Sequence, residues 1–225
     1  MPKVDLAVLY EDNHVLVLNK PAGLPTMGVA ADQESLLERA RQYIKHRYQK
    51  PGNVYLGAMS RLDAPVSGVL LFARTSKAAA RLTAQFVAHT VDKTYWAIVA
   101  GEVAPASGRL VGFVKKDERH RKMHWTATAQ DGAQEARLNY QVKKSTPLGT
   151  LVEVMLETGR KHQIRLQLAH EGWPVVGDRK YGSRAEFPLG IALHSRRLVF
   201  THPTRDDRIE VVAPLPASWA KARLE

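Results

Sequence analysis

The sequence predicts an α+β fold with a mainly antiparallel, mixed sheet and a few flanking helices. Segments with strand-like alternation outnumber those with the one-face spacing of a helix, of which there are about three. Most of the strand-like segments follow one another across short polar turns, as the strands of hairpins do. No internal repeat or low-complexity linker divides the 225 residues, so we expect one domain that spans residues 1–225.

The first half of the chain is expected to contain a hairpin, two helices and a buried strand. Residues 6–10 and 14–19 flank a polar turn and are predicted to pair. A helix over 35–48 is predicted because apolar residues recur on one face. Residues 68–75 are expected to form a short apolar strand, and 76–90 to form a second helix.

The helix over 35–48 has a start signal of its own. Ser35 and Glu38 have the spacing of a capping box, in which a serine hydroxyl accepts a hydrogen bond from the amide three residues later. Asp32 is the alternative start of this helix. The sequence therefore predicts that the helix begins next to Ser35, with Asp32 left open as a competitor.

The second half is expected to be richer in strands, over 93–101, 150–158, 191–200 and 208–212. A hairpin is also predicted on Asp131-Gly132, because Asp-Gly between alternating segments is a strong signal for a two-residue turn. A helix over 159–172 is expected to have Thr158 as its cap and to end at Gly172.

The chain carries a strong positive charge. Its formal net charge is +11 and its isoelectric point is about 9.9, which favours a polyanionic partner such as nucleic acid or an anionic membrane. The segment 113–125 is expected to be a basic loop that contacts a nucleic-acid backbone, although a solvated loop is the plain alternative. Its cations are Lys115, Lys116, Arg119, Arg121 and Lys122.

Several kinds of site and location are disfavoured by what the sequence lacks. There is no cysteine, so disulfides and thiolate-bound zinc are excluded. The histidines lack the close pairing of a zinc site, and we predict no metal and no cofactor. The N-terminus lacks the apolar run of a signal peptide. Since the longest apolar stretch, 69–73, is far shorter than the roughly 20 residues that span a bilayer, we expect a soluble, cytoplasmic protein.

Asp63 is the residue whose role the local sequence leaves open. In MSRLDAPVSG (59–68) it precedes a proline turn, so it is either a turn residue or a reactive group at the point where a strand opens onto a loop. A later basic segment offers an arginine that could form an ion pair with this carboxylate. Such a pair would keep the aspartate ionised inside a cleft that otherwise disfavours its charge.

Five segments, in order along most of the chain, carry a resemblance to a known family. They are LYEDNHVLVLNKPAGLPT, SRLDAPVSGVLLFART, AQF with KTYWAIVAG, LETGRKHQIRLQLAHEGWPVVGDRKYG and LHSRRLVFTHP. Together they resemble the RluA-type pseudouridine synthases, which convert uridine to pseudouridine within structured RNA. The resemblance implies a pseudouridine-synthase-like catalytic domain of the isomerase class. It also implies a stem-loop of ribosomal or transfer RNA as the partner, and no metal or other cofactor.

The resemblance implies roles for individual residues. Asp63 matches the family's catalytic aspartate, which acts at the ribose of the target uridine. Tyr95 matches the tyrosine whose ring packs on the flipped base and whose hydroxyl is placed for proton transfer from carbon 5. Arg165 matches the basic residue that pairs with the aspartate, and Ile164 beside it is expected to be apolar wall. Arg61 matches the arginine that can fill the gap left by the extruded nucleotide.

Plain structural roles remain open for three of these residues. Tyr95 could be core, Arg165 a solvated helix arginine and Arg61 a simple phosphate contact. The rival interpretations of the whole chain are a non-catalytic RNA-binding protein and, more weakly, an RNA hydrolase. Neither the choice between nucleophilic attack and proton abstraction by the aspartate nor the identity of the RNA follows from the sequence.

The chain departs from the family pattern at three positions. Ser60 stands where histidine is common, Val66 where threonine is frequent and Gln167 where histidine is usual. These departures leave substrate choice and rate open. We expect no separate N-terminal RNA-binding domain before the first hairpin, no protein partner, and a monomer.

Overall fold

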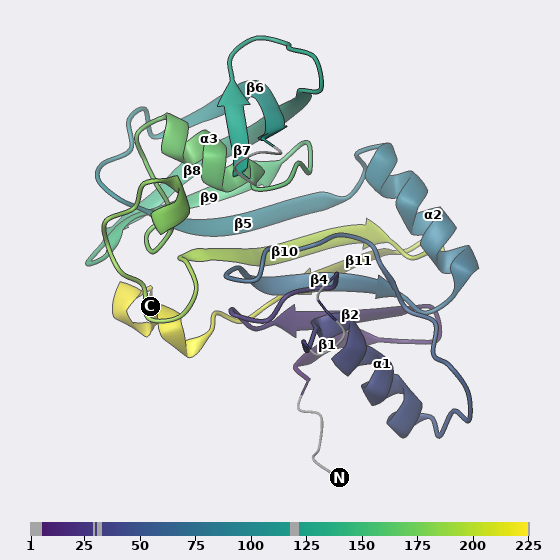
Figure 1. The fold of residues 1–225 in the computed structure, drawn as a ribbon. Helices are drawn as coiled ribbons and strands as arrows, with labels where there is room; N and C mark the ends of the chain where they lie inside the picture. The colour runs from purple at the N-terminus through teal and green to yellow at the C-terminus, as the bar shows by residue number, and fades with distance from the viewer. Residues whose placement is uncertain (1–5, 29, 31–32, 118–121, 225) are drawn as a thin grey trace. The chain divides into compact units, whose positions relative to one another are not determined.

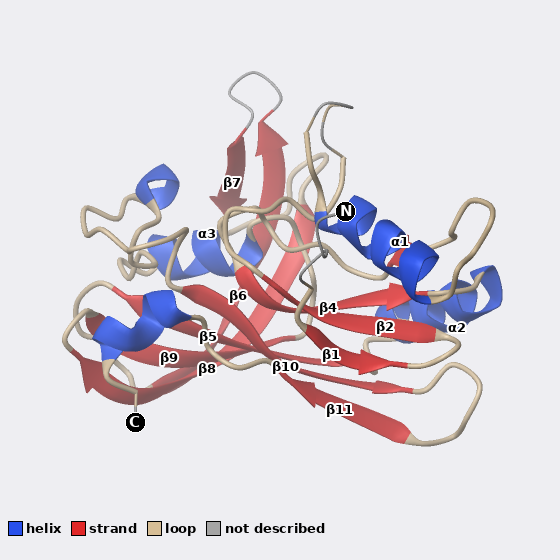
Figure 2. Ribbon diagram, turned by 90° about the horizontal axis from the view of Figure 1, so that it is seen from below, coloured by secondary structure: helices blue, strands red, loops and turns tan. Residues whose placement is uncertain are grey.

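The computed structural model describes residues 6–28, 30, 33–117 and 122–224. The chain divides into two compact units: unit 1 is 1–91 with 195–215, and unit 2 is 92–194 with 216–225. Each unit contains antiparallel strands and few helices (Figure 1; Figure 2). The predicted α+β class is therefore confirmed. Among the described residues, no helix has the length and apolar character needed to cross a membrane.

Unit 1 is a sheet accompanied by two helices. Its strands are β1 (Val8–Glu11), β2 (Val15–Lys20), β3 (Gly57–Ala58), β4 (Ser67–Ala73), β11 (Arg208–Val212) and most of β10 (Leu193–Thr201). Their order is β1-β2-β4-β10, with β3 paired to β4 and β11 to β10. The β1–β2, β2–β4 and β10–β11 pairs are antiparallel. The hairpin and the strands predicted in this part of the chain are confirmed.

The two helices of unit 1 begin at side-chain caps. Helix α1 (Leu36–Arg47) is capped by Ser35, whose hydroxyl accepts from the Glu38 amide at 3.3 Å. Helix α2 (Ser76–Val87) is capped in the same way by Thr75. Ser35 is thus confirmed as the cap of the first helix, and the alternative start, Asp32, lies outside the described residues.

One core cluster of unit 1 lies between its sheet and α2. Every residue of β4 is buried, and Ala78 and Leu82 of α2 pack on Leu71 and Phe200 in the same cluster. Strand β4 begins beside β10 at a backbone contact that only glycine allows. A Cβ on Gly68, whose φ is +115°, would lie 2.2 Å from the Ser195 carbonyl oxygen.

Unit 2 is a five-stranded sheet in the order β5-β9-β8-β6-β7. Its strands are β5 (Asp92–Val99), β6 (Ser107–Asp117), β7 (Lys122–Thr126), β8 (Gln134–Thr146) and β9 (Gly149–Leu156), and neighbours pair antiparallel. One α-helix, α3 (Gln163–His170), and two short 3₁₀ helices, η1 (Arg179–Tyr181) and η2 (Ala217–Ala222), complete the described part of this unit. The strands predicted over 93–101 and 150–158 are confirmed.

The hairpin predicted on Asp131-Gly132 is wrong, although the turn itself forms. Gly132 has a φ of +72°, and the Ala133 amide donates to the Gln130 carbonyl at 2.9 Å. The strands on either side of this turn, β7 and β8, do not pair with each other because β6 lies between them. The reason is that the basic segment before the turn folds back on itself as the hairpin β6–β7.

The predicted cap of α3 is also wrong. The helix begins at Gln163 with His162 as its N-terminal flanking residue, so Thr158 lies before a short loop and not at the helix start. The Thr158 hydroxyl instead donates to the Gln163 side-chain oxygen at 2.8 Å. The predicted end is close to the observed one, since Gly172 follows the helix with a φ of +85°.

Candidate functional site

Asp63 lies in unit 1, in the loop that joins β3 to β4. Its carbonyl accepts from the Val66 amide at 3.0 Å, which closes a turn. Leu62 and Val66 are buried, Asp63 is partly exposed, and Arg61 is exposed. The loop therefore anchors itself with two apolar side chains and leaves the carboxylate at the surface of the unit.

The residues on both sides of Asp63 are held by the segment 20–26. The Thr26 hydroxyl donates to the Leu62 carbonyl at 2.9 Å and accepts from the Leu62 amide at 3.2 Å. The Gly23 amide donates to the Ala64 carbonyl at 2.7 Å. Since buried polar groups keep their geometry when their hydrogen bonds are satisfied, these contacts fix the backbone on both sides of Asp63.

Lys20, at the end of β2, is the second support of this loop. It has no exposed surface, and its Nζ donates to the carbonyl oxygens of Pro21, Leu24 and Ala64 at 2.8, 2.7 and 3.1 Å. Burial lowers the pKa of the Lys20 ammonium to about 8, and the negative charge of Asp63 opposes this shift. Lys20 thus places a buried amine near the carboxylate.

The sequence interpretation gave Lys20 and Thr26 no role. Both belong to the segment LYEDNHVLVLNKPAGLPT, the first of the five that carry the resemblance. The sequence signal that could have identified Lys20 is its place directly after the apolar segment 14–19. A lysine next to an apolar strand either reaches solvent or, when buried, binds several hydrogen-bond acceptors.

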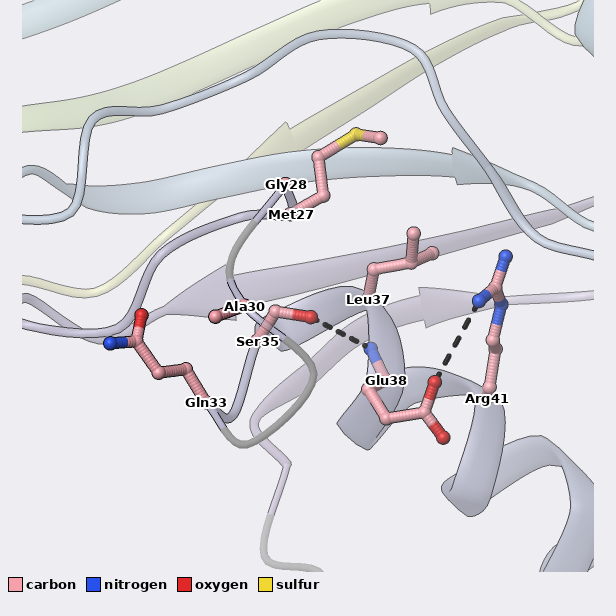
Figure 3. A pocket seen from close by; sticks show the side chains of 8 residues that line it. All are labelled: Met27, Gly28, Ala30, Gln33, Ser35, Leu37, Glu38 and Arg41. Carbon is pink, nitrogen blue, oxygen red and sulfur yellow. Dashed lines mark hydrogen bonds and ion pairs between the residues drawn. The ribbon is translucent and has the colours of Figure 1, made fainter.

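The residues that follow Thr26 in the chain line a hollow of about 420 Å³. It is lined by Met27, Gly28, Ala30, Gln33, Ser35, Leu37, Glu38 and Arg41. Figure 3 shows that the Ser35 hydroxyl faces the Glu38 amide and that the Glu38 carboxylate faces Arg41, at 3.7 Å. Ser35, Glu38 and Arg41 are therefore engaged with each other, and the lining includes none of the predicted site residues.

The other catalytic candidates lie in unit 2. Tyr95 is on β5, partly exposed, opposite Val154 of β9. Ile164 and Arg165 are in the first turn of α3 and are both buried, with 5% of each residue exposed. Because Arg165 is buried, the alternative that it is a solvated arginine on the surface of a helix is wrong.

Arg165 forms a bidentate ion pair with Asp178. Its Nε lies 2.7 Å from Oδ2 and its Nη2 lies 2.9 Å from Oδ1, and Asp178 is only 2% exposed. The guanidinium carbon also lies 4.9 Å from the centre of the Tyr181 ring. A planar guanidinium held by a carboxylate on one edge and an aromatic face has little freedom to rotate.

Tyr181 is linked back to the start of α3. Its hydroxyl lies 2.6 Å from Nδ1 of His162, which occupies the left-handed region with a φ of +57°. Asp178 and Tyr181 were missed by the sequence interpretation, although both stand in GDRKYG, at the end of the fourth segment that carried the resemblance. Their contacts with Arg165 depend on the short 3₁₀ helix η1, and the periodicity of apolar residues in the sequence does not predict this helix.

Gln167, one of the three departures from the family pattern, is buried under the sheet of unit 2. Its Nε2 donates to the carbonyl oxygens of Leu110 and Ala136 at 3.1 and 3.2 Å. Its Oε1 has no hydrogen-bond partner among the described residues. Gln167 therefore ties α3 to β6 and β8 by one half of its amide.

The basic segment is not the loop that the sequence predicted. Lys115 and Lys116 lie on β6 and Lys122 lies on β7, in a paired hairpin. Lys116 and Lys122 are exposed and Lys115 is partly exposed. Arg119 and Arg121 lie outside the described residues. Strand pairing gives these lysines defined directions because successive side chains of a strand point to opposite faces.

The predicted site residues thus fall into two groups by unit. Arg61 and Asp63 belong to unit 1, and the others belong to unit 2. Unit 1 offers a carboxylate on a braced loop, a group suited to proton transfer or nucleophilic attack, and unit 2 offers a fixed guanidinium and an aromatic ring. Within the described ranges, no group of three His, Asp or Glu side chains is arranged to hold a metal ion.

Comparison with known proteins gives a consistent family. The model of the RNA pseudouridylate synthase family matches residues 14–170. A ribosomal large subunit pseudouridine synthase D from Xylella fastidiosa is 36% identical over 95% of this chain and 67% of its own length. A tRNA pseudouridine synthase C from Vibrio parahaemolyticus is 30% identical, covering 97% and 94%. The structure of human RNA pseudouridylate synthase domain containing 4 matches with a TM-score of 0.80 and 26% identity, covering 97% of this chain and 94% of that one.

Proposed function

Because this chain belongs to the RNA pseudouridylate synthase family, we propose that it isomerises specific uridines in structured RNA, with Asp63 as the catalytic carboxylate. The chain is an RNA pseudouridine synthase, an enzyme of the isomerase class. The observation that carries the role of Asp63 is the bracing of its loop by Thr26, Gly23 and Lys20. An ordinary turn aspartate needs no such support, whereas a reacting group must be held in place.

The reaction rearranges atoms within one nucleotide. The glycosidic bond from the ribose to N1 of uracil breaks, the base turns, and a bond from the same ribose carbon to carbon 5 forms. The proton on carbon 5 leaves and N1 takes up a proton, so the product is an isomer of the substrate. Ionised Asp63 either attacks the ribose carbon or removes a proton from the neighbouring ribose position. Tyr95 packs on the detached base, and its hydroxyl is placed for the proton of carbon 5.

Arg165 is the proposed partner of Asp63, and Asp178 and Tyr181 support it. The contacts of the guanidinium with Asp178 and Tyr181 set its orientation in advance. A charge that is already oriented stabilises an ionised carboxylate without reorganisation during the reaction. Ile164 supplies apolar wall beside it, and Lys20 adds a second positive charge near Asp63.

RNA binding is proposed to use the positive charge of the chain. The net charge of +11 suits a phosphate backbone, and the lysines of the β6–β7 hairpin are its natural contacts. Exposed Arg61, two residues before Asp63, enters the stack that the target nucleotide leaves. We propose that both units act as one catalytic domain of a cytoplasmic monomer.

The substrate is proposed to be a stem-loop of ribosomal or transfer RNA. Relatives of this chain are named for each of these RNAs: a ribosomal large subunit synthase at 36% identity and a tRNA synthase at 30%. Mapping pseudouridine in the ribosomal and transfer RNA of cells with and without the protein identifies the target. A site that disappears from one RNA class and returns with wild-type protein assigns it.

The role of Asp63 is tested with RNA that carries tritium on carbon 5 of uridine. Wild-type protein is expected to release tritium, and Asp63→Asn to release at least about 10³-fold less, because it removes the ionised group. Asp206→Asn, which changes an exposed aspartate of the same unit, is the matched control and should keep wild-type release.

Three outcomes separate the alternatives. Equal release by wild type and Asp63→Asn contradicts the catalytic role. Tight RNA binding by wild type without any release supports a non-catalytic RNA-binding protein. Strand breaks in the same RNA support a hydrolase.

A further inference from the structure

The β6–β7 hairpin has little support from the rest of its sheet. Strand β8 pairs with β6 only as far as Val114, and Lys115–Asp117 pair with β7 alone. Figure 2 shows β7 and the end of β6 standing apart from the other strands of unit 2. A two-stranded hairpin is marginally stable by itself, so the direction of this one must be set by contacts at its base.

Trp125 of β7 makes one of these contacts. Its indole is stacked on the imidazole of His170, the last residue of α3, with ring centres 3.6 Å apart and planes 17° apart. The indole also fills the space above Gly112 of β6, where an added Cβ would lie 2.5 Å from Nε1. The side chain is therefore held between a strand backbone and the end of a helix.

A small apolar cluster continues the same attachment. Val114, the cross-strand partner of Trp125, is buried against Ala136 of β8 and Leu166 of α3, and Met123 packs against this cluster. β6 and β7 both contact α3, beside which Figure 1 shows them. Leu166 directly follows Arg165 in this helix. The hairpin is thus attached to the helix that carries the proposed partner of Asp63.

We propose that Trp125 and His170 are positioning residues that hold the basic hairpin on α3 and so orient its lysines toward the RNA substrate. This inference rests on the proposed RNA substrate. A hairpin free to swing would have to be ordered when RNA binds, and the lost entropy would weaken binding even though every charge is kept. The stack supplies that order beforehand, in the free protein.

A direct role of Trp125 as a base-stacking platform is the competing explanation. One face of the indole is already covered by His170, and the atoms around Nε1 lie against Gly112. On the face that His170 covers, a base could stack only after His170 moved away. The two explanations therefore make opposite predictions for a variant that removes the imidazole.

The variants are Trp125→Leu, His170→Leu and the control Trp96→Leu, which removes a tryptophan of β5 in the same unit. We expect Trp125→Leu and His170→Leu each to weaken binding of a substrate stem-loop by about five- to tenfold, because the hairpin is no longer ordered in the free protein. The double variant should be no weaker than either single one, since both break the same stack. Trp96→Leu should bind like wild type.

The salt dependence of binding separates positioning from loss of charge. The slope of log affinity against log salt should stay at the wild-type value in Trp125→Leu. In Lys116→Ala the slope should become shallower by about 0.7–0.9 for each phosphate that the protein no longer neutralises. In tritium release, Trp125→Leu should raise KM and leave kcat unchanged.

Amide hydrogen exchange of the free protein completes the test and does not depend on RNA. Exchange in β6 and β7 should become faster in both single variants and stay unchanged in Trp96→Leu. Wild-type affinity or tighter binding in His170→Leu, unchanged exchange in the hairpin, or a loss of kcat in place of a rise in KM would overturn the proposal. Failure of wild-type protein to bind RNA would count against the proposed function, whereas the exchange result would still report on the stack.

Discussion

The loop that presents Asp63 and the helix that presents Arg165 are both fixed by polar contacts, but these contacts fall on different atoms. Around Asp63 they fall on the backbone of its neighbours Leu62 and Ala64. At Arg165 they fall on the guanidinium itself. The carboxylate is thus positioned through its neighbours, and the arginine by its own side chain.

Because of this difference, substitutions around Asp63 can affect its positioning without removing its charge, whereas a substitution at Arg165 affects both the proposed catalytic group and the stability of the fold. The groups that brace the Asp63 loop, Thr26 and Lys20, can be changed while the carboxylate stays in the chain. A change at Arg165 removes a charge from a buried pair and affects the folded state directly. Substitutions in the two regions should therefore differ in how much stability they cost.

The largest effect is expected from Arg165→Met. It leaves Asp178, which is 2% exposed, as a buried carboxylate without its bidentate partner, and should lower the free energy of unfolding by about 3–5 kcal/mol. Asp63→Asn should cost less, because Asp63 is only partly buried. Chemical denaturation of both variants measures the difference. The double variant Arg165→Met, Asp178→Leu should recover most of the stability, and equal instability of the single and double variants would show that the unpaired charge is not the cause.

Lys20 should make stability depend on pH in the alkaline range. In the unfolded chain the amine keeps its proton up to about pH 10.5, and in the folded protein its pKa is about 8. Between these values the unfolded state binds more protons, so the free energy of unfolding should rise with pH, by up to about 3 kcal/mol at 1.36 kcal/mol per pKa unit.

The Lys20→Met variant isolates this contribution. The difference in unfolding free energy between wild type and Lys20→Met should shift in favour of wild type from pH 8 to pH 10.5. In Asp63→Asn the rise should begin at a lower pH, since the charge of Asp63 raises the pKa of Lys20. A difference that stays flat over this range would mean that Lys20 does not titrate as a buried amine.

Thr26→Val should have a smaller effect on stability and a clear effect on catalysis. It removes the hydroxyl that bonds both the amide and the carbonyl of Leu62, and should cost about 1–3 kcal/mol of unfolding free energy. Tritium release should fall in the same variant because the Asp63 loop loses its brace. Thr26→Ser keeps the hydroxyl and serves as the control; if Thr26→Val retained full activity, the brace would have no catalytic part.

The smallest effect is expected from a partly exposed counterpart of the Arg165 pair. Glu157 accepts from Arg109, Arg137 and Asn139, and these bonds, with the hydrogen bond from Arg109 as the largest cause, lower its pKa to about 2. Glu157→Gln should nevertheless cost less than about 1 kcal/mol, because exposed ion pairs contribute little.

The direction of the Glu157 pKa shift determines the pH range in which the stability of Glu157→Gln is compared with that of wild type. The folded pKa lies below the ordinary value of 4.5, so the stabilisation is fully present above pH 4.5 and is lost as pH falls toward 2. The stability difference between wild type and Glu157→Gln should therefore shrink between pH 5 and pH 3. A difference comparable with that of Arg165→Met would remove the contrast between buried and exposed pairs.

Local signals in the sequence predicted local structure well. The Ser35 cap, the first hairpin and the apolar strand β4 depend on neighbouring residues, and all three are confirmed. The Asp131-Gly132 turn was also recognised, but strand order is not a local property. Because β6 pairs with β7, β8 pairs with β6 and not with β7, and the residues of the turn do not predict this strand order.

The support of the candidate site was less accessible from sequence. Thr26 meets Leu62 across 36 positions and Lys20 meets Ala64 across 44, and nothing in the local pattern links them. Arg165 and Asp178 stand 13 residues apart on either side of a loop, which no helical spacing connects. Motif resemblance led to the proposed reacting groups, whereas the contacts of the residues that hold them became visible only in the fold.

Lys20 also has a consequence for the chemical reactivity of the protein. Because burial lowers its pKa to about 8, a larger fraction of the Lys20 amine is unprotonated near neutral pH than in an ordinary lysine. This amine, however, has no exposed surface and is bonded to three carbonyl oxygens. Its acylation requires the segment 20–26 to open, so the rate of modification depends on how often this segment opens. Lys20 is thus a natural site for covalent labelling that reports on the motions that release the loop of Asp63.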